Sequence, residues 1–543
     1  MRKSIALYTA AMTLCGALAA APAVNVFAEE TTTEASTDST AETSASDSTP
    51  PAMPEGESAG AEGGTAPEGG ASAGGGADTQ TYDYSGDLTG ALTADGEEVT
   101  SDGETITATD ADQNAALAEN GGTLTITGGT LEKSGDDTNG DNCNFYGINS
   151  IVLSVGDGSQ VNISDSTLTA DSEGSNAIFA TDSGTVYVNN VTILTSAGNS
   201  RGLDATYGGT IVASNVDITT NGDHCASLAT DRGGGYISVT DSTLSTAGSG
   251  SPLIYSTGDI EVDNVTGTAT GSQIAGMEGL NTIMISNSDL TSEVTSATAS
   301  DPVANGIILY QSTSGDAETS TGETALFQAV DSTLTSSIES GSMFYITNTA
   351  VNVLLSNTVL NFDSDAANLL QIEGNDSNNW GTAGSNGADV TFTALNETLT
   401  GNISVDTISS LDLYLLDGTT YTGAMTITEN SVNTDVSDAP ITVSIDSDST
   451  WVVTDDTTIT NLNAEDGAQI VDADGNTVTI VADGETVVDG DSDLTVTVTG
   501  TYSTTVTTDT DNEIAETNID RSGFEAVYGT DDSTEETTET AEG

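Results

Sequence analysis

The 543-residue sequence has almost no basic side chains. Lys and Arg total 6 against 84 Asp and Glu, which gives a formal net charge of −78, and there is one His. A nucleic-acid-binding protein needs clustered Lys and Arg to displace counterions from phosphates, so this class is excluded. The same shortage argues against docking on an anionic membrane surface. Acid–base chemistry by His or Lys is confined to very few residues.

Aromatic residues are also scarce, at 4% of the chain, and there are only 3 Cys. Hydrophobic residues still make up 35%, which supplies enough Val, Ile and Leu for a large core. Beyond the N-terminal region, no apolar run approaches the roughly 20 residues that cross a bilayer. We therefore expect a folded protein with no membrane span in its mature chain.

Residues 1–28 have the pattern of a secretory signal peptide. Arg2 and Lys3 precede an apolar stretch, and Val26-Phe27-Ala28 offers a cleavage site after Ala28. This pattern predicts an extracellular bacterial protein, either secreted or associated with the cell surface.

Residues 29–80 consist mainly of Thr, Ser, Glu, Ala, Gly and Pro. Such a segment cannot bury enough apolar surface to offset its ordering entropy, so we expect a disordered linker. We expect the same of an acidic tail over 503–543, although Phe524, Val527 and Tyr528 could pack on the end of the body.

A short motif with a central Asn or Asp recurs through the body of the chain, and successive copies are spaced by 25, 25, 26, 23, 23, 44 and 26 residues. An insertion near 297–323 accounts for the long interval. A fixed period of this size indicates a solenoid. The central residues form one column: Asp165, Asn190, Asn215, Asp241, Asn264, Asn287, Asp331 and Asn357.

Each repeat contains short runs of alternating apolar residues bounded by Gly, Asn, Asp and Ser, as in Thr185-Val186-Tyr187-Val188. This pattern predicts strands and turns, and the period fits a single-stranded right-handed parallel β-helix, which is an all-β fold. Asn and Asp tolerate left-handed backbone, and stacked Asn amides can bond from rung to rung as a structural ladder. We expect an N-terminal cap region over 81–120 with a helix at 110–119, regular rungs over 121–402 and less regular rungs over 403–502.

Cys143 and Cys225 are the two Cys that follow the signal peptide. A disulfide is the first expectation for an exported protein. The predicted rungs place the two residues three rungs apart, about 14 Å along the axis, whereas a disulfide needs Cα atoms within about 7 Å. We therefore expect free thiols.

The Asn- and Asp-punctuated turns, with phrases such as Ala229-Thr230-Asp231-Arg232-Gly233-Gly234-Gly235, resemble bacterial secreted right-handed β-helix proteins of the pectin-lyase-like fold, in particular adhesin-like repeat proteins. The resemblance covers about 100–490 and rests on architectural motifs. That fold class implies either a non-catalytic adhesin or a polysaccharide lyase or glycoside hydrolase, and fold alone does not choose between them.

An enzyme of this class needs acid–base residues on adjacent rungs. The densest polar cluster of the sequence comprises Arg201 with the candidate catalytic residues Asp182, Asp204, His224, Asp231 and Arg232. With 84 acidic residues in the chain, chance clustering and ordinary turn positions explain the same pattern.

The sequence implies no cofactor, with Ca²⁺ as the one alternative. Asp489, Asp491 and Asp493 begin like an EF-hand loop, but Leu494 and Gly500 stand where that loop requires Gly and Glu. Trp380, Trp451 and several Tyr residues could stack on sugars or pack in the fold. The preferred hypothesis is an adhesin-like rod that binds host or microbial glycans or surface proteins. The alternative is a polysaccharide-acting β-helix enzyme.

Overall fold

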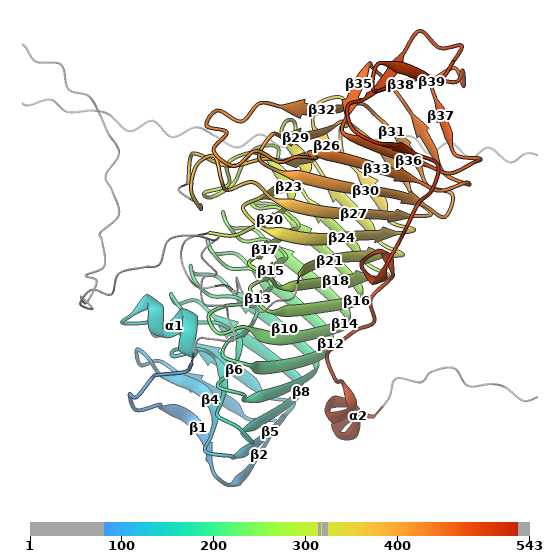
Figure 1. Cartoon of the computed structure of the whole chain (residues 1–543). Helices are drawn as coiled ribbons and strands as arrows, with labels where there is room; N and C mark the ends of the chain where they lie inside the picture. The colour runs from blue at the N-terminus through green and yellow to red at the C-terminus, as the bar shows by residue number, and fades with distance from the viewer. Residues whose placement is uncertain (1–80, 313–316, 318–323, 379, 530–543) are drawn as a thin grey trace, which may run out of the picture. The chain divides into compact units, whose positions relative to one another are not determined.

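The computed structural model describes residues 81–529, apart from 313–316, 318–323 and 379. The predicted signal peptide with its Ala28 cleavage site and the predicted linker lie outside the described residues. The described chain is an all-β parallel β-helix in which successive rungs add one strand to each of three faces (Figure 1). Among the described residues, no helix is long and apolar enough to span a membrane.

Face A is a single parallel sheet of 13 strands. In order, they are β1 (Gly90–Asp95), β4 (Asn114–Glu119), β7 (Val152–Val155), β9 (Ile178–Thr181), β11 (Leu203–Ala205), β13 (Leu228–Thr230), β15 (Ile254–Ser256), β17 (Ala275–Glu278), β20 (Asn305–Tyr310), β23 (Ser342–Thr347), β26 (Asn368–Ile372), β29 (Ile403–Asp406) and β32 (Met425–Thr428).

Face B is a parallel ladder that follows face A in each rung. Its strands are β2 (Glu98–Asp102), β5 (Thr123–Thr127), β8 (Gln160–Ala170), β10 (Thr185–Thr195), β12 (Gly209–Thr220), β14 (Gly235–Thr246), β16 (Asp259–Ala269), β18 (Thr282–Ser286), β21 (Ala325–Val330), β24 (Ala350–Ser356), β27 (Asp389–Leu395), β30 (Ser410–Leu416), β33 (Ile441–Ile445), β36 (Asn461–Ala464) and β41 (Tyr502–Ser503).

Face C is built partly from the same strands, because β8, β10, β12, β14 and β16 continue around the corner from face B. Its separate strands are β3 (Thr105–Ala108), β6 (Thr130–Lys133), β19 (Asp289–Ser292), β22 (Thr333–Ser336) and β25 (Val359–Asn361), followed by the sheet of β28 (Thr398–Thr400), β31 (Thr420–Thr422), β34 (Thr450–Val452) and β37 (Gln469–Val471).

The C-terminal end of the body departs from the rung pattern. A four-stranded sheet there contains β35 (Thr457–Ile459), β40 (Thr495–Val498), β38 (Thr479–Ala482) and β39 (Glu485–Val488). β38 and β39 form an antiparallel hairpin. The predicted region of less regular rungs over 403–502 therefore contains further rungs and then this small sheet.

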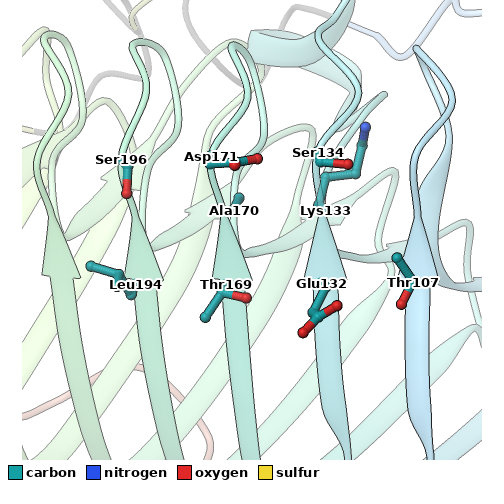
Figure 2. Close-up of a pocket in the computed structure, with 9 residues that line it drawn as sticks. All are labelled: Thr107, Glu132, Lys133, Ser134, Thr169, Ala170, Asp171, Leu194 and Ser196. Atoms are coloured by element: carbon teal, nitrogen blue, oxygen red, sulfur yellow. The ribbon is translucent and has the colours of Figure 1, made fainter.

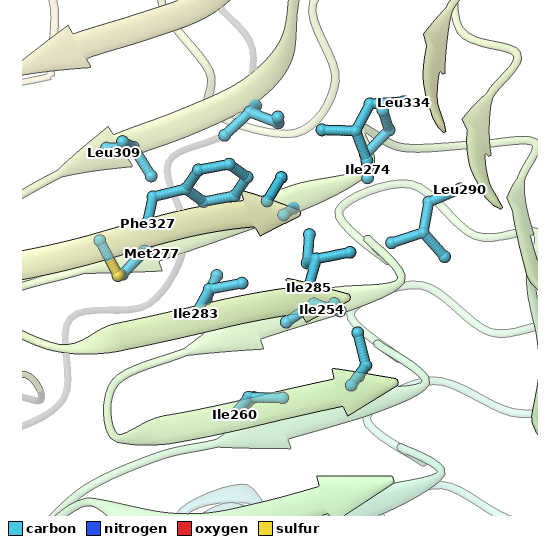
Figure 3. Close-up of a cluster of buried hydrophobic side chains, with 14 of the residues drawn as sticks. Ile254, Ile260, Ile274, Met277, Ile283, Ile285, Leu290, Leu309, Phe327 and Leu334 are labelled. Carbon is cyan, nitrogen blue, oxygen red and sulfur yellow. The ribbon is translucent and has the colours of Figure 1, made fainter. Parts of the chain in front are cut away.

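The core is made of columns of apolar side chains, one from each rung. On face B, Ile260 pairs with Ile283, which pairs with Phe327, and all three are fully buried (Figure 3). Each isoleucine or phenylalanine buried this way contributes about 1.5–3 kcal/mol by leaving water. Because every rung buries its apolar residues only against its neighbours, the spacing of the sequence repeat and the register of the sheet coincide.

The corner between faces B and C explains the Asn and Asp column. All eight residues of the column have positive φ, between 48° and 56°. Asn and Asp adopt this left-handed conformation more readily than other non-glycine residues. The amides bond from rung to rung in only part of the column. Asn190 donates to Asp165 at 2.6 Å and Asn264 donates to Asp241, whereas Asn215 donates to Asn189 beside the column.

A second ladder, which the sequence analysis missed, lies just inside this corner. The residue after the left-handed one is often Ser, and its hydroxyl accepts the backbone amide from the same corner of the preceding rung. Ser242 Oγ accepts from Val216 N, and Ser288 Oγ accepts from Val265 N, each at 3.0 Å. These hydroxyls satisfy buried amides at the point where the sheet turns.

The predicted helix over 110–119 is wrong. Residues 114–119 form β4, which pairs in parallel with β1 and β7. Ala-rich composition favours a helix, but strand pairing in the rung overrides this weak local preference. The described residues instead contain two short helices, α1 (Gly140–Tyr146) and α2 (Ser522–Tyr528), with the 3₁₀ helix η2 (Thr510–Asn512).

The prediction of a disordered tail from 503 is wrong for residues 503–529. The segment 509–528, which we call the strap, runs back along face B from β27 to β10 (Figure 1). Phe524 and Tyr528 do pack on the body, but on its side at Tyr187 rather than on its end. Residues 530–543 lie outside the described residues.

Candidate functional site

The polar cluster predicted from the sequence forms only in part. Arg201 lies between two carboxylates on neighbouring rungs of face A, with Nη1 3.3 Å from Asp204 Oδ2 and Nη2 3.3 Å from Asp231 Oδ2. Asp204 is in β11 and Asp231 directly follows β13, so parallel pairing of these strands brings the two acids together. Asp204 is fully buried, and Arg201 and Asp231 are buried as well.

The segment 134–149, which contains α1, covers this cluster. Arg201 Nη1 donates to Asn144 Oδ1 at 2.9 Å, Thr206 Oγ1 donates to the Phe145 carbonyl at 2.8 Å, and the Arg232 guanidinium lies 3.7 Å from the centre of the Phe145 ring. An N-cap bond from the Asn142 amide to the Asn139 side chain helps to fix the helix in place. The covering segment therefore seals Asp204 from solvent.

One guanidinium cannot neutralise two carboxylates. Asp231 also accepts the Arg232 amide at 2.8 Å, which stabilises its charge. At Asp204, burial outweighs the opposing attraction of Arg201 and raises the pKa to about 8, with a further upward contribution from Asp231. Burial therefore favours the protonated form of Asp204 in spite of its contact with Arg201.

The remaining candidate catalytic residues lie elsewhere. Asp182 follows β9 and lines an open pocket, described below. His224 is exposed in the turn that precedes β13, whereas Asp231 follows β13, so the strand separates them. The six-residue sequence cluster thus divides into a buried group around Arg201, a pocket residue and a surface histidine.

Cys143 and Cys225 are both buried free thiols. Burial raises the pKa of the Cys225 thiol to about 11. Cys225 stands in a column of serines: Ser175 N donates to Ser200 Oγ, Ser200 N donates to Cys225 Sγ at 3.0 Å, and Cys225 N donates to Ser251 Oγ. In the turn between faces C and A, its sulfur therefore accepts a backbone amide as the serine hydroxyl does on the neighbouring rung.

The open pocket at Asp182 has a cavity volume of about 640 Å³. It combines aromatic rings with carboxylates. Its lining residues are Tyr82, Tyr84, Gly86, Asp87, Leu88, Glu119, Asn120, Val155, Gly156, Asp157 and Asp182. They come from the segment before β1 and from the turns that follow β4, β7 and β9 on three successive rungs.

Two tyrosines of this pocket are held by other aromatic rings. The Tyr146 ring, on α1, lies 5.3 Å from Tyr82 edge to face and 5.2 Å from Tyr84. Tyr207 stacks on Tyr146 at 5.7 Å with only 8° between the ring planes. Leu88 and Tyr82 also pack on a small apolar cluster outside face A. The rings of Tyr82 and Tyr84 are consequently fixed but only half-buried.

The carboxylates of the pocket repel one another. Burial raises the pKa of Glu119, with Asp95 as a second cause, and burial raises the pKa of Asp182, with Asp157 as a second cause. No cation lines the pocket among the residues described. This environment attracts positive charge and hydrogen-bond donors. Tyr82 and Tyr84 precede the first rung, so no periodicity in the sequence marks them.

A second pocket, of about 350 Å³, lies over face C and is lined by Glu132, Lys133 and Asp171 among others (Figure 2). Burial lowers the pKa of Lys133 to about 8. Its ammonium group donates to the backbone carbonyls of Asp110 and Gly135. Lys133 is therefore engaged in holding the turn after β6.

The calcium candidates Asp489, Asp491 and Asp493 are exposed in the loop after β39. Within the described part of the chain, no three His, Cys, Asp or Glu side chains are grouped so that they could hold a metal ion. Trp380 and Trp451 are buried, and Trp380 stacks on Tyr310 at 4.4 Å, so these rings pack within the fold.

No protein-family model matches the chain, and no curated protein is detectably similar to it.

Proposed function

We propose that this chain is an exported, non-catalytic β-helix of the pectin-lyase-like, adhesin-like type, which acts outside the cell by recognising a glycan or a surface protein. A stack of rungs supplies an extended, stiff surface without special residues. The observation that carries the proposal is a contrast between two sites. Asp204 is sealed beneath α1, whereas the pocket with Tyr82 and Tyr84 is open.

The pocket suits a sugar. Tyrosine rings stack on the apolar faces of sugar rings, and carboxylates accept hydrogen bonds from hydroxyl groups. The negative charge of Asp87, Asp157 and Asp182 opposes uronate or sulfated polymers. The preferred ligand class is therefore a neutral sugar or one that carries an amino group, with Lys-rich or Arg-rich protein loops as the second class.

A binding experiment tests this assignment. Full-length protein is applied to a panel of neutral, amino and uronate glycans, and affinity is measured for the wild type and for Tyr84→Ala. We expect at least a tenfold loss in the variant, equivalent to about 1.4 kcal/mol. Tyr236→Ala is the matched control, because Tyr236 is an exposed tyrosine on β14 and is not part of the pocket lining. Equal losses in both variants, or none in either, would contradict the assignment.

A polysaccharide-acting enzyme is the second candidate. It is favoured by one observation: Asp204 and the residue after β13, Asp231, stand on adjacent rungs and share Arg201. Such an enzyme would have to move segment 134–149 to admit a polymer.

A further inference from the structure

The strap follows a single column of outward-facing residues on face B. These residues are direct strand partners from rung to rung: Tyr187, Val212, Ser238, Glu261, Met284, Gln328, Leu354 and Thr393. We call this set the outward column. It crosses eight strands, from β10 to β27, and the strap contacts it at both ends and between them.

Polar side chains of the outward column hold the backbone of the strap. Gln328 makes a pair of hydrogen bonds with Ala515, accepting its amide at 2.8 Å and donating to its carbonyl at 3.1 Å. Glu261 accepts the amides of Asn518 and Ile519. An extended backbone presents amide and carbonyl groups at regular intervals. The column residues therefore bind the polypeptide backbone itself, independently of its side chains.

Two side chains of the strap add sequence specificity. Arg521 donates to Ser238 Oγ at 2.8 Å and to the Ala213 carbonyl at 3.2 Å. Phe524 packs with Val212 in a small buried cluster. An Arg followed three residues later by Phe is therefore the recognised pattern.

Without its cover, the outward column would expose apolar side chains between its polar ones. Val212, Met284 and Leu354 face outward but are 0%, 2% and 1% exposed. Met284 lies between the strap contacts at Glu261 and Gln328. On a chain with a net charge of −78, apolar side chains interspersed with hydrogen-bonding ones form a binding surface rather than a solubilising one.

We propose that the outward column is a docking site for the C-terminal segment of a second copy of this chain, in competition with the chain's own strap. The strap joins the body through residues 504–508, which form no helix or strand and are mostly exposed. A strap from another copy would make the same contacts, so only the connection differs. The tethered strap has an effective concentration of about 1 mM, which keeps exchange low until the strap is weakened.

The first test measures peptide binding to full-length protein. A fluorescent peptide of residues 509–529 is titrated into Arg521→Ala protein, and anisotropy is recorded. We expect binding at least ten times tighter than to Val527→Ala, a control in the strap whose side chain is 41% exposed. A peptide carrying the Arg521→Ala change should bind at least ten times more weakly. Equal binding of the two peptides, or no binding to folded Arg521→Ala protein, overturns the docking site.

The second test identifies the occupant by complementation. A donor has a normal strap but a column damaged by Glu261→Ala and Gln328→Ala, and the acceptor is Arg521→Ala with an intact column. Mixed, they should form a one-to-one complex in analytical ultracentrifugation, and each alone should remain monomeric. If the peptide binds but this complex does not form, the occupant of the column is not the strap of a second copy.

If Arg521→Ala fails to fold, a protease site inserted within 504–508 of the otherwise unchanged chain replaces it. After cleavage, the labelled peptide must exchange into the column, and failure to do so overturns the proposal.

Discussion

Asn190 donates a hydrogen bond from its side-chain amide to the Asp165 carboxylate at 2.6 Å, across one rung of the β-helix. Both residues have left-handed backbone, with φ of 54° and 52°. Their side chains are exposed, so the bond itself adds little, and the backbone conformation is the larger part of their role.

This relationship predicts the ranking of two substitutions. Asn190→Ala removes the short polar side chain that makes the left-handed region accessible to this residue and should cost about 1–2 kcal/mol, whereas Asn190→Gly keeps the conformation freely available and should cost less than 1 kcal/mol. Chemical denaturation of both variants measures the difference. Equal losses for alanine and glycine would show that the amide ladder, which both variants lack, matters more than the corner geometry.

The serine column predicts that Cys225 is replaceable. Cys225→Ser retains an acceptor for the Ser200 amide and should change the unfolding free energy by less than about 1 kcal/mol. Cys225→Ala leaves that buried amide without its acceptor and should cost about 1–3 kcal/mol. Thermal denaturation under reducing conditions compares them. Similar losses in the two variants would contradict the role of the sulfur as an acceptor.

The sequence predicted the β-helix because its period is set by the corner itself, where only Asn, Asp or Gly fit the left-handed backbone comfortably. The prediction from sequence failed at β4, because Ala115, Ala116 and Ala118 carry no strand signal. Pairing with β1 and β7 decides their conformation. The prediction also failed at the strap, whose binding depends on side chains such as Glu261 that are more than 250 residues away in sequence.

The candidate site was harder to predict for a related reason. Asp204 and Asp231 both lie near Arg201, because β11 and β13 pair in parallel with an offset of 25 residues. Their burial depends on segment 134–149, an insertion that follows no repeat. Tyr84 precedes the first rung, so no periodicity marks it.

Asp204 predicts a pH dependence. Its pKa is raised to about 8 in the folded chain by burial, above the value of 3.8 for an exposed aspartate. The folded state therefore binds the extra proton, and this contribution to stability is full below about pH 4 and is lost as pH rises through 8. Asp259 and Glu397, with pKa values raised to about 7 by burial, act in the same direction.

Urea denaturation at pH 5 and pH 8 should accordingly show wild-type stability falling by several kcal/mol. Asp204→Asn, an amide that mimics the protonated acid, should reduce this fall, and the exposed Asp491→Asn should not. A fall of the same size in Asp204→Asn would place the titrating groups elsewhere.

The core predicts one large effect. Phe344 contacts Phe327 and Phe392 edge to face, each at 5.7 Å between ring centres, and all three rings are buried. Phe344→Ala removes both contacts and should destabilise the chain by about 3–5 kcal/mol. Val359→Ala, at a residue 52% exposed, should cost less than about 0.5 kcal/mol. Guanidinium denaturation distinguishes them, and equal midpoints would mean that these rungs are not closely packed.

Under the proposed function, the chain binds its ligand without chemical turnover. The direct measurement follows binding and product release together on one glycan panel, using wild-type protein and Asp204→Asn. We predict binding to a neutral or amino glycan, no release of reducing ends or unsaturated products, and unchanged binding in Asp204→Asn. Product release by the wild type that Asp204→Asn abolishes would contradict the claim and identify the buried pair Asp204 and Asp231 as catalytic.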